Sequence, residues 1–225
     1  MGGQACVFYG AAEFSRDCDI VVLSDDSNFK RLENAVSDLL AECIAVPPMD
    51  WSYLERGHAI HFRCKHAAAL NIRLDVMTCM RGCDAFESLW ERRLTLQDVD
   101  GTIFEILGIE DLIKAKKTQR DKDWPMIRRL VDAHYDQFKS DPTPERIRFW
   151  LRESRSPEML VEVATRFPDQ VPHECMDRPF LERIDSAEFP FIQKALELEQ
   201  ERERKADAEY WSPLKRELEK LRRNR

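Results

Sequence analysis

The feature that most constrains this chain is a change in its hydrophobic period near residue 108. Before that point, short runs with β-branched or alternating apolar residues are typical of strands and are interspersed with helical stretches. After it, every segment has apolar side chains at the spacing of an amphipathic helix. We therefore predict an α+β fold, with one domain over residues 1–107 and an all-helical C-terminal domain over residues 108–225.

The individual elements follow from the same periodicity and from helix-capping and proline signals. In the first domain, residues 2–12 have helical character, and strands are expected at 17–23, 58–64 and 70–78. Helices are expected there at about 28–42 and 84–93, followed by a strand or turn near 101–106. In the second domain, the predicted helices cover residues 109–117, 122–138, 144–153, 157–167 and 187–223.

Charge and cysteine usage restrict the class of protein. The formal net charge of −7 gives no overall attraction to nucleic acid or to an anionic membrane, so a polynucleotide partner would need a local basic patch or a metal ion. No stretch approaches the roughly 20 apolar residues of a transmembrane helix, so no membrane association is expected. The seven cysteines are odd in number and irregularly spaced, which is typical of reduced thiols in a cytoplasmic protein.

Three aspartates indicate a site for phosphate chemistry. Asp17 and Asp19 are two residues apart on a predicted strand, so both side chains leave the same face of the sheet. Asp75 lies on a later strand and completes a three-carboxylate cluster if the two strands are neighbours. Carboxylate oxygens are the ligands of hard cations such as Mg²⁺, and paired metal ions serve phosphoryl-group transfer.

A glycine pair precedes these acids. The backbone of Gly2 and Gly3 can approach a triphosphate closely enough for amide groups to reach its oxygens. Arg73 is on the predicted face of Asp75, where it can contact a phosphate or pair with the acids. Both alternatives remain open at this stage.

The order of these features resembles the polymerase β-type nucleotidyltransferase superfamily, and within it the bacterial branch that includes AbiEii-type toxins. The matching residues are the pair Gly2-Gly3, the segment Arg16-Asp17-Cys18-Asp19, and Leu74-Asp75-Val76. A Glu-Asp-Leu helix from Glu110 to Lys116 and the segment Arg120-Asp121-Lys122-Asp123 extend the likeness over roughly residues 1–130. The family normally has residues before the glycine pair, so this lead-in is either missing or lies upstream of Met1.

The resemblance implies a nucleotidyltransferase fold, in which helices flank a small mixed sheet, and a set of site residues. Asp17, Asp19 and Asp75 would hold Mg²⁺ or Mn²⁺ and carry catalysis. The nucleoside triphosphate (NTP) would contact a set of glycines and cations, namely Gly2, Gly3, Arg16, Arg73, Lys116 and Arg120. A lysine suits phosphate as a point charge and an arginine as a two-pronged donor.

The implied activity is metal-dependent transfer of a nucleoside monophosphate from an NTP, with release of pyrophosphate. The leading acceptor is tRNA or a protein, in a toxin–antitoxin pair in which an antitoxin would be a partner. One alternative is nucleotidylation of an antibiotic, as in aminoglycoside-modifying enzymes. Another is a non-catalytic module of the same fold that binds a nucleotide or a partner protein.

Two further features have simpler interpretations. His58, His61, Cys64 and His66 suggest zinc, but their spacing fits no strong zinc pattern, and an ordinary hairpin edge is the better interpretation. The basic run at 215–225 is explained by a solvated amphipathic helix, with contact to RNA phosphates or to an antitoxin as the alternatives.

Overall fold

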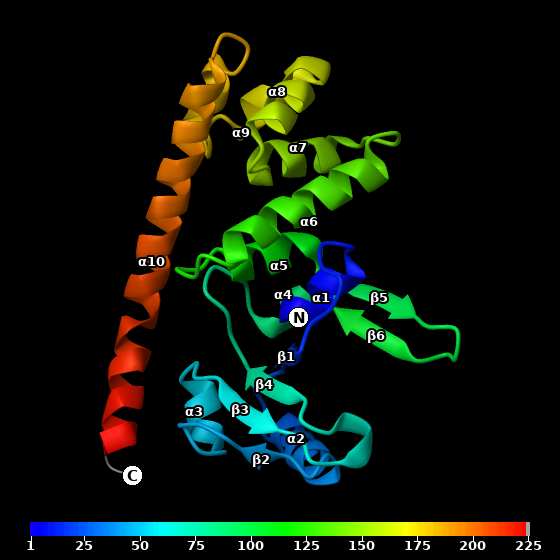
Figure 1. Ribbon diagram of the computed structural model, residues 1–225, viewed down its shortest axis with the longest axis vertical. Helices are drawn as coiled ribbons and strands as arrows, with labels where there is room; N and C mark the ends of the chain where they lie inside the picture. The colour runs from blue at the N-terminus through cyan, green and yellow to red at the C-terminus, as the bar shows by residue number, and fades with distance from the viewer. Residues whose placement is uncertain (224–225) are drawn as a thin grey trace. The chain divides into compact units, whose positions relative to one another are not determined.

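A computed structural model describes residues 1–223, which form two compact units (Figure 1). The first unit comprises Met1–Phe8, Ala12–Ala115 and the chain from Glu209 onward, and the second comprises Tyr9–Ala11 and Lys116–Ala208. The last two residues of the basic run, Asn224 and Arg225, lie outside the described residues. Every helix in residues 1–223 is too short or too polar to cross a bilayer.

The first unit is built on a four-stranded mixed sheet with strand order β1-β4-β3-β2. Its strands are β1 (Asp17–Val21), β4 (Arg73–Met77), β3 (Ile60–Arg63) and β2 (Glu42–Cys43). Strand β1 runs parallel to β4, whereas β3 is antiparallel to both of its neighbours. The parallel pairing places Asp17 and Asp19 of β1 directly beside residues of β4.

Helices α2 (Asp26–Asp38) and α3 (Trp51–Glu55) bury the apolar face of this sheet. Helix α2 begins where it does because the side chain of Asp25 accepts a hydrogen bond from the Asn28 amide at 2.7 Å, an N-cap contact. Leu32 and Val36, four residues apart on α2, contribute to the core with buried residues of α3 and the strands. The strand and α3 members of this core are Leu54, Ile60, Phe62, Cys64, Leu74 and Val76.

The remaining elements of the first unit are α1 (Gly2–Phe8), the short 3₁₀ turn η1 (Ala67–Ala69) and α4 (Phe86–Glu91), followed by a β-hairpin and α5. The hairpin consists of β5 (Leu94–Gln97) and β6 (Ile103–Ile106), and α5 spans Ile109–Lys116. The last part of α10 (Phe189–Arg223) also belongs to this unit.

The second unit is helical. It contains α6 (Asp123–Phe138), α7 (Pro144–Glu153), α8 (Pro157–Arg166), η2 (Pro168–Gln170), α9 (Val171–Glu174), η3 (Pro179–Arg183) and the earlier part of α10. Helices α7 and α8 each start with an oxygen-bearing cap, Thr143 or Ser156, followed by proline at the first helical position. Trp124, Phe149 and Trp150 fill the interior, as their apolar bulk predicts.

The predicted α+β class and helical C-terminal region are confirmed. The sequence did not indicate β2, α3 or β5, the last of which pairs with β6 in the segment near 101–106 that was expected to be a strand or turn. Strand β2 has two residues and α3 has five, so neither is long enough to show a hydrophobic period. Strand β5 was hidden because it follows α4 after only two residues.

Candidate functional site

The sheet of the first unit has one apolar and one polar face. Residues 18, 20, 74, 76, 60 and 62 pack into the core with α2 and α3. Alternation along each strand therefore sends their neighbours to the opposite face. On that face, Asp19, Asp75 and His61 occupy directly adjacent positions on β1, β4 and β3. Neighbouring strands are about 4.8 Å apart, so the three side chains form one row across the sheet.

A second polar row lies two residues away on each strand. It places Asp17 of β1 beside Arg73 of β4, and Arg73 beside Arg63 of β3. The predicted proximity of all three aspartates to one another and to Arg73 therefore follows from the parallel pairing of β1 with β4. Of the three, Asp17 is exposed, Asp19 is partly buried and Asp75 is buried.

Asp75 is the most constrained of these acids. Its Oδ1 accepts a hydrogen bond from Arg73 Nε at 2.8 Å, and His61 Nδ1 lies 2.8 Å from the same oxygen. A carboxylate only accepts, so a hydrogen bond from His61 to Asp75 requires the proton on Nδ1; the same Nδ1 also lies 3.2 Å from Nη2 of Arg73. Burial raises the pKa of the Asp75 carboxyl, but the hydrogen bonds from His61 and Arg73 outweigh it and hold this pKa below its usual value.

Arg73 interacts electrostatically with all three aspartates. Its hydrogen bond to Asp75 raises the pKa of the guanidinium, and the charges of Asp17 and Asp19 act in the same direction. Of the two roles that the sequence left open for Arg73, this arrangement has it paired with an acid. Contact with a phosphate stays a prediction, because it would require the side chain to exchange partners.

Gly2 packs directly against the carboxylate of Asp19. A Cβ added at Gly2 would lie 1.9 Å from Asp19 Oδ2, and the backbone there has a φ of +69°. Both the contact and the left-handed conformation require glycine at this position. A Cβ at Gly3 would lie 2.3 Å from Ser15 Oγ, so the second glycine is also closely packed. The pair opens α1, and its contact with a triphosphate stays a prediction.

Arg16, which directly precedes Asp17, is exposed and lies over the ring of Phe14, with Cζ 5.9 Å from the ring centroid. Between the two acids, Cys18 packs against the core beneath the sheet, and burial raises the pKa of its thiol. A half-buried, protonated thiol is a poor nucleophile, so Cys18 is a packing residue.

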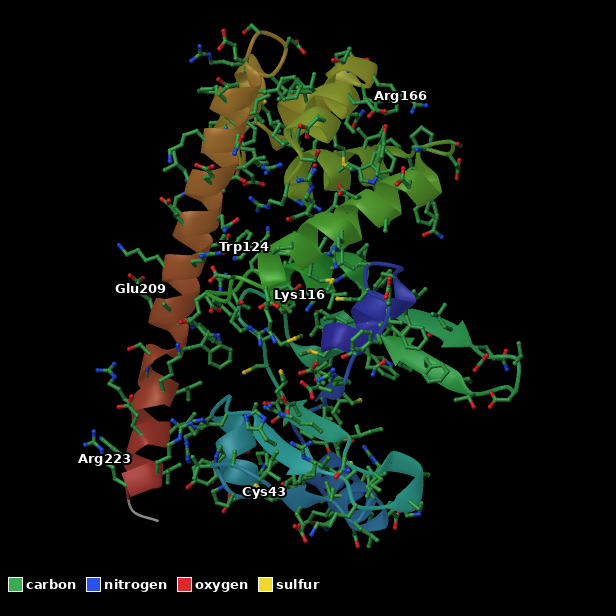
Figure 2. The ribbon with its side chains drawn as sticks, in the orientation of Figure 1. Cys43, Lys116, Trp124, Arg166, Glu209 and Arg223 are labelled. Carbon is green, nitrogen blue, oxygen red and sulfur yellow. The ribbon has the colours of Figure 1, made fainter. Side chains whose placement is uncertain are left out.

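Lys116 and Arg120 belong to the second unit, where both converge on one acid. Lys116, labelled in Figure 2, has its Nζ 3.8 Å from Asp123 Oδ1, and Arg120 Nε donates to Asp123 Oδ2 at 2.7 Å. The hydroxyl of Thr118 donates to the same oxygen at 2.6 Å. Asp123 is buried, so these donors compensate its charge. The role of the two cations toward a triphosphate stays a prediction.

The polar face fits a divalent cation by its chemistry. Asp19 and Asp75 offer hard carboxylate oxygens from adjacent strand positions, and Asp17 adds a third two residues along β1. Within residues 1–223, however, no three or more His, Cys, Asp or Glu side chains are grouped as a ready-made metal site. Oδ1 of Asp75 is occupied by Arg73 and His61. A cation would have to use the other oxygen or displace the arginine.

His61 is the site residue that the sequence did not single out for this role. In the sequence it belongs to a set of histidines and a cysteine whose spacing fits no strong zinc pattern. In the structure, Cys64 is buried in the core, while His61 faces the acids. The alternation of Ile60, His61 and Phe62 could have placed it on the polar face, but only the pairing of β3 with β4 places it beside Asp75.

No protein-family model matches this chain, and no curated protein matches it in sequence.

Proposed function

We propose that this protein is a metal-dependent nucleotidyltransferase of the polymerase β type, with its site on the polar face of the sheet. The observation that carries the proposal is the direct pairing of Asp19 with Asp75 on parallel strands, with Asp17 on the same face. Phosphoryl transfer needs such a cluster of carboxylates, since its catalysis is mostly positioning and charge neutralisation. The mixed sheet and the helical region are both compatible with the fold that this family has.

In this proposal, Asp17, Asp19 and Asp75 hold Mg²⁺ or Mn²⁺. When bound, the cation would offset the charge of the triphosphate and of the departing pyrophosphate. The chain's own residues set the geometry: Gly2 limits the positions open to the Asp19 carboxylate, and His61 orients Asp75 through its Oδ1. Gly3, Arg16, Arg73, Lys116 and Arg120 are the proposed contacts of the NTP, and a tRNA or a protein is the proposed acceptor.

The cellular setting of this activity is also part of the proposal. The resemblance to AbiEii-type proteins supports a toxin with an antitoxin partner, and the odd number of irregularly spaced cysteines supports the cytoplasm.

A second candidate is the non-catalytic module, and the contacts of Arg73 favour it. The guanidinium already neutralises Asp75 and interacts with the charges of Asp17 and Asp19. An internal arginine that takes the place of a cation is one way for a fold to keep its acids without catalysing transfer. The two candidates differ in whether a nucleoside monophosphate is transferred from the NTP to an acceptor.

The test uses the full chain, each α-labelled NTP, Mg²⁺ or Mn²⁺, and a lysate that supplies RNA, proteins and metabolites. The Asp19→Asn/Asp75→Asn variant removes two charges with little change in volume. The control is Asp26→Asn/Asp38→Asn, which removes the same charge from exposed positions of α2. We expect transfer by the wild type and by the control, and a loss of at least about 100-fold in the site variant, as when one transition-state charge partner is removed.

The destination of the label identifies the acceptor as RNA, protein or a small molecule such as an antibiotic. Binding of Mn²⁺ and NTP without any transfer would favour the non-catalytic module. Transfer that survives in the site variant would overturn the assignment of these acids.

A further inference from the structure

The last turns of α10 present a basic face, which is distinct from the polar face of the sheet. From residue 209 to residue 223 the helix has five basic residues and three acids. The basic ones are Lys215, Arg216, Lys220, Arg222 and Arg223, and all five are exposed. Figure 2 labels Arg223 at the end of this helix. The whole chain has a net charge of −7, so this group of five cations is a local feature.

The opposite face of the same turns is used for packing within the first unit. Leu214 contacts Gly57, where an added Cβ would lie 3.8 Å from its Cδ1. Glu217 accepts a hydrogen bond from Arg56 at 2.8 Å and lies 2.8 Å from Nε2 of the buried His58. These contacts fix the orientation of the helix about its axis. They also compensate the charge of Glu217, so Glu219 is the exposed acid among the basic residues.

The geometry of a helix then defines the basic surface. At about 100° per residue, the five cations cover an arc of about 160°, while Leu214, Glu217, Leu218 and Leu221 share the other side. Lys215 and Arg223 are eight residues apart, which corresponds to about 12 Å along the axis at 1.5 Å per residue. This is a surface of a size that can contact several phosphates of one nucleic-acid strand.

The helix dipole explains only part of this pattern. Cations in a last helical turn are favoured because they offset the partial negative charge of the free carbonyls. Lys220, Arg222 and Arg223 are in that turn. Lys215 and Arg216 precede it by more than one turn, where the dipole effect is small.

We propose that the surface formed by Lys215, Arg216, Lys220, Arg222 and Arg223 binds the phosphate backbone of an RNA. An anionic membrane is a poorer fit, because the leucines of these turns face inward and none is left on the outer side to enter lipid. A protein partner is a poorer fit, because the surface has no aromatic or aliphatic anchor. The idea that this RNA is also the acceptor of the nucleotide rests on the proposed function, whereas its binding to this surface does not.

The experiment measures binding of a fluorescently labelled single-stranded RNA to the full chain as a function of salt. Each neutralised phosphate contact contributes about 0.7 to the slope of log affinity against log salt. We expect Arg216→Gln/Lys220→Gln and Arg222→Gln/Arg223→Gln each to reduce this slope by about 1.4, and to weaken binding at low salt at least about fivefold. The control, Lys194→Gln/Arg202→Gln, removes the same charge from exposed positions earlier on α10 and should match the wild type.

Three outcomes would overturn the proposal. One is the absence of RNA binding by the wild type, and another is an equal loss in the control. The third is equal affinity for polyglutamate, for anionic vesicles or for duplex DNA, which would make the surface a general anion binder. Circular dichroism of each variant verifies that α10 remains folded. The Asp19→Asn/Asp75→Asn variant separates the two proposals, because it should lose transfer and still bind RNA.

Discussion

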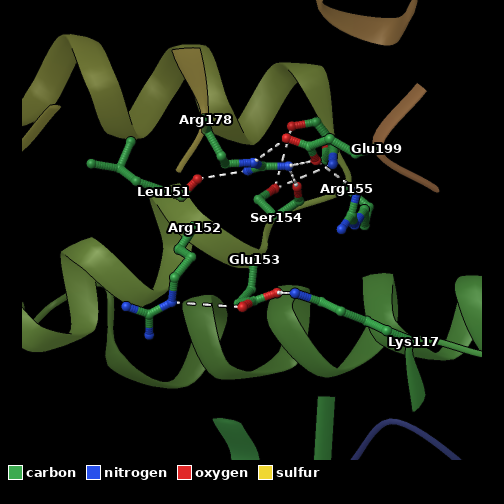
Figure 3. Close-up of polar contacts among 9 residues, drawn as sticks. Lys117, Leu151, Arg152, Glu153, Ser154, Arg155, Arg178 and Glu199 are labelled. Carbon is green, nitrogen blue, oxygen red and sulfur yellow. Dashed lines mark hydrogen bonds and ion pairs between the residues drawn. The ribbon is translucent and has the colours of Figure 1, made fainter. Parts of the chain in front are cut away.

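The two units each contain a cluster of charged side chains, and the clusters differ in how fully their charges are paired. In the second unit, Arg178 donates to both oxygens of Glu199, at 2.9 and 2.7 Å, and to the carbonyl oxygens of Leu151 and Ser154 (Figure 3). Arg155 adds a further bond to Glu199 at 2.9 Å. The side chain of Arg178 is 3% exposed and that of Glu199 is 11% exposed.

On the sheet of the first unit, by contrast, three aspartates share the face with Arg73 and His61. Asp17 is exposed, and Arg73 and His61 both contact the same oxygen of Asp75, Oδ1. In the closed cluster, the carboxylate of Glu199 is paired with both Arg178 and Arg155, and only the Nε of Arg155 is buried there without a hydrogen-bond partner among the residues named. In the open one, Asp17 is exposed and the side chain of Arg73 is 37% exposed. This difference predicts a structural role for the closed cluster of the second unit, and it leaves the open cluster of the first unit accessible to solvent.

The largest expected effect is the loss of Arg178. Arg178→Met should lower the free energy of unfolding by about 3–5 kcal/mol, the usual consequence of removing one partner from a buried ion pair. Denaturant unfolding at neutral pH measures it. A loss below about 1 kcal/mol would show that this cluster is as open to solvent as the sheet face, and the contrast between the two would fail.

The second test uses acid. Burial lowers the pKa of His134 from 6.5 to about 4, and the charge of Arg146 adds to this shift. Nδ1 of the neutral ring accepts a hydrogen bond from Trp150 Nε1 at 2.9 Å. Because the folded pKa lies below the unfolded one, protonation favours unfolding, so stability should fall as the pH drops from about 6.5 to about 4.

Unfolding curves collected across this pH range check the prediction, with His134→Gln as the comparison. The variant has no titrating group at this position, so its stability should depend less on pH in this window. Identical pH dependence in both proteins would contradict a neutral, buried His134.

The smallest expected effect is the loss of Arg73. Arg73→Met should cost about 1 kcal/mol in the free energy of unfolding, because the side chain of Arg73 is 37% exposed and Asp75 keeps its contact with His61. A lowered Asp75 pKa stabilises the fold above the unfolded pKa, and this contribution is lost as the pH falls through the folded pKa. Without Arg73 the pKa of Asp75 should rise, and the acid-dependent part of the stability should shrink.

NMR titration of the Asp75 carboxyl in wild type and Arg73→Met measures that change directly, and Arg63→Met is a matched control from the same face of the sheet. A loss of stability as large as that of Arg178→Met would show that the polar face is a closed structural network after all.

Much of the architecture follows from local sequence. The caps at Asp25, Thr143 and Ser156 and the prolines at 144 and 157 specify helix starts without help from distant residues. The alternation around Ile72–Val76 predicts a strand, and its polar positions 73 and 75 are the ones that face the site. The elements that escaped prediction are short, or, like β5, depend on a partner strand for their hydrogen bonds.

Some features of the candidate site also follow from local sequence, and others depend on contacts between distant segments. The sequence by itself determined that Asp17 and Asp19 share one face of the strand and that Cys18 is on the other, since a strand has a period of two. The register of β1 against β4 and of β3 against β4 was decided by the tertiary structure, because strand order depends on packing between distant segments. That register puts Asp19 beside Asp75, recruits His61, and gives Arg73 an acid as its partner. The inclusion of the last turns of α10 in the first unit, through His58 and Glu217, was likewise decided only by long-range contacts.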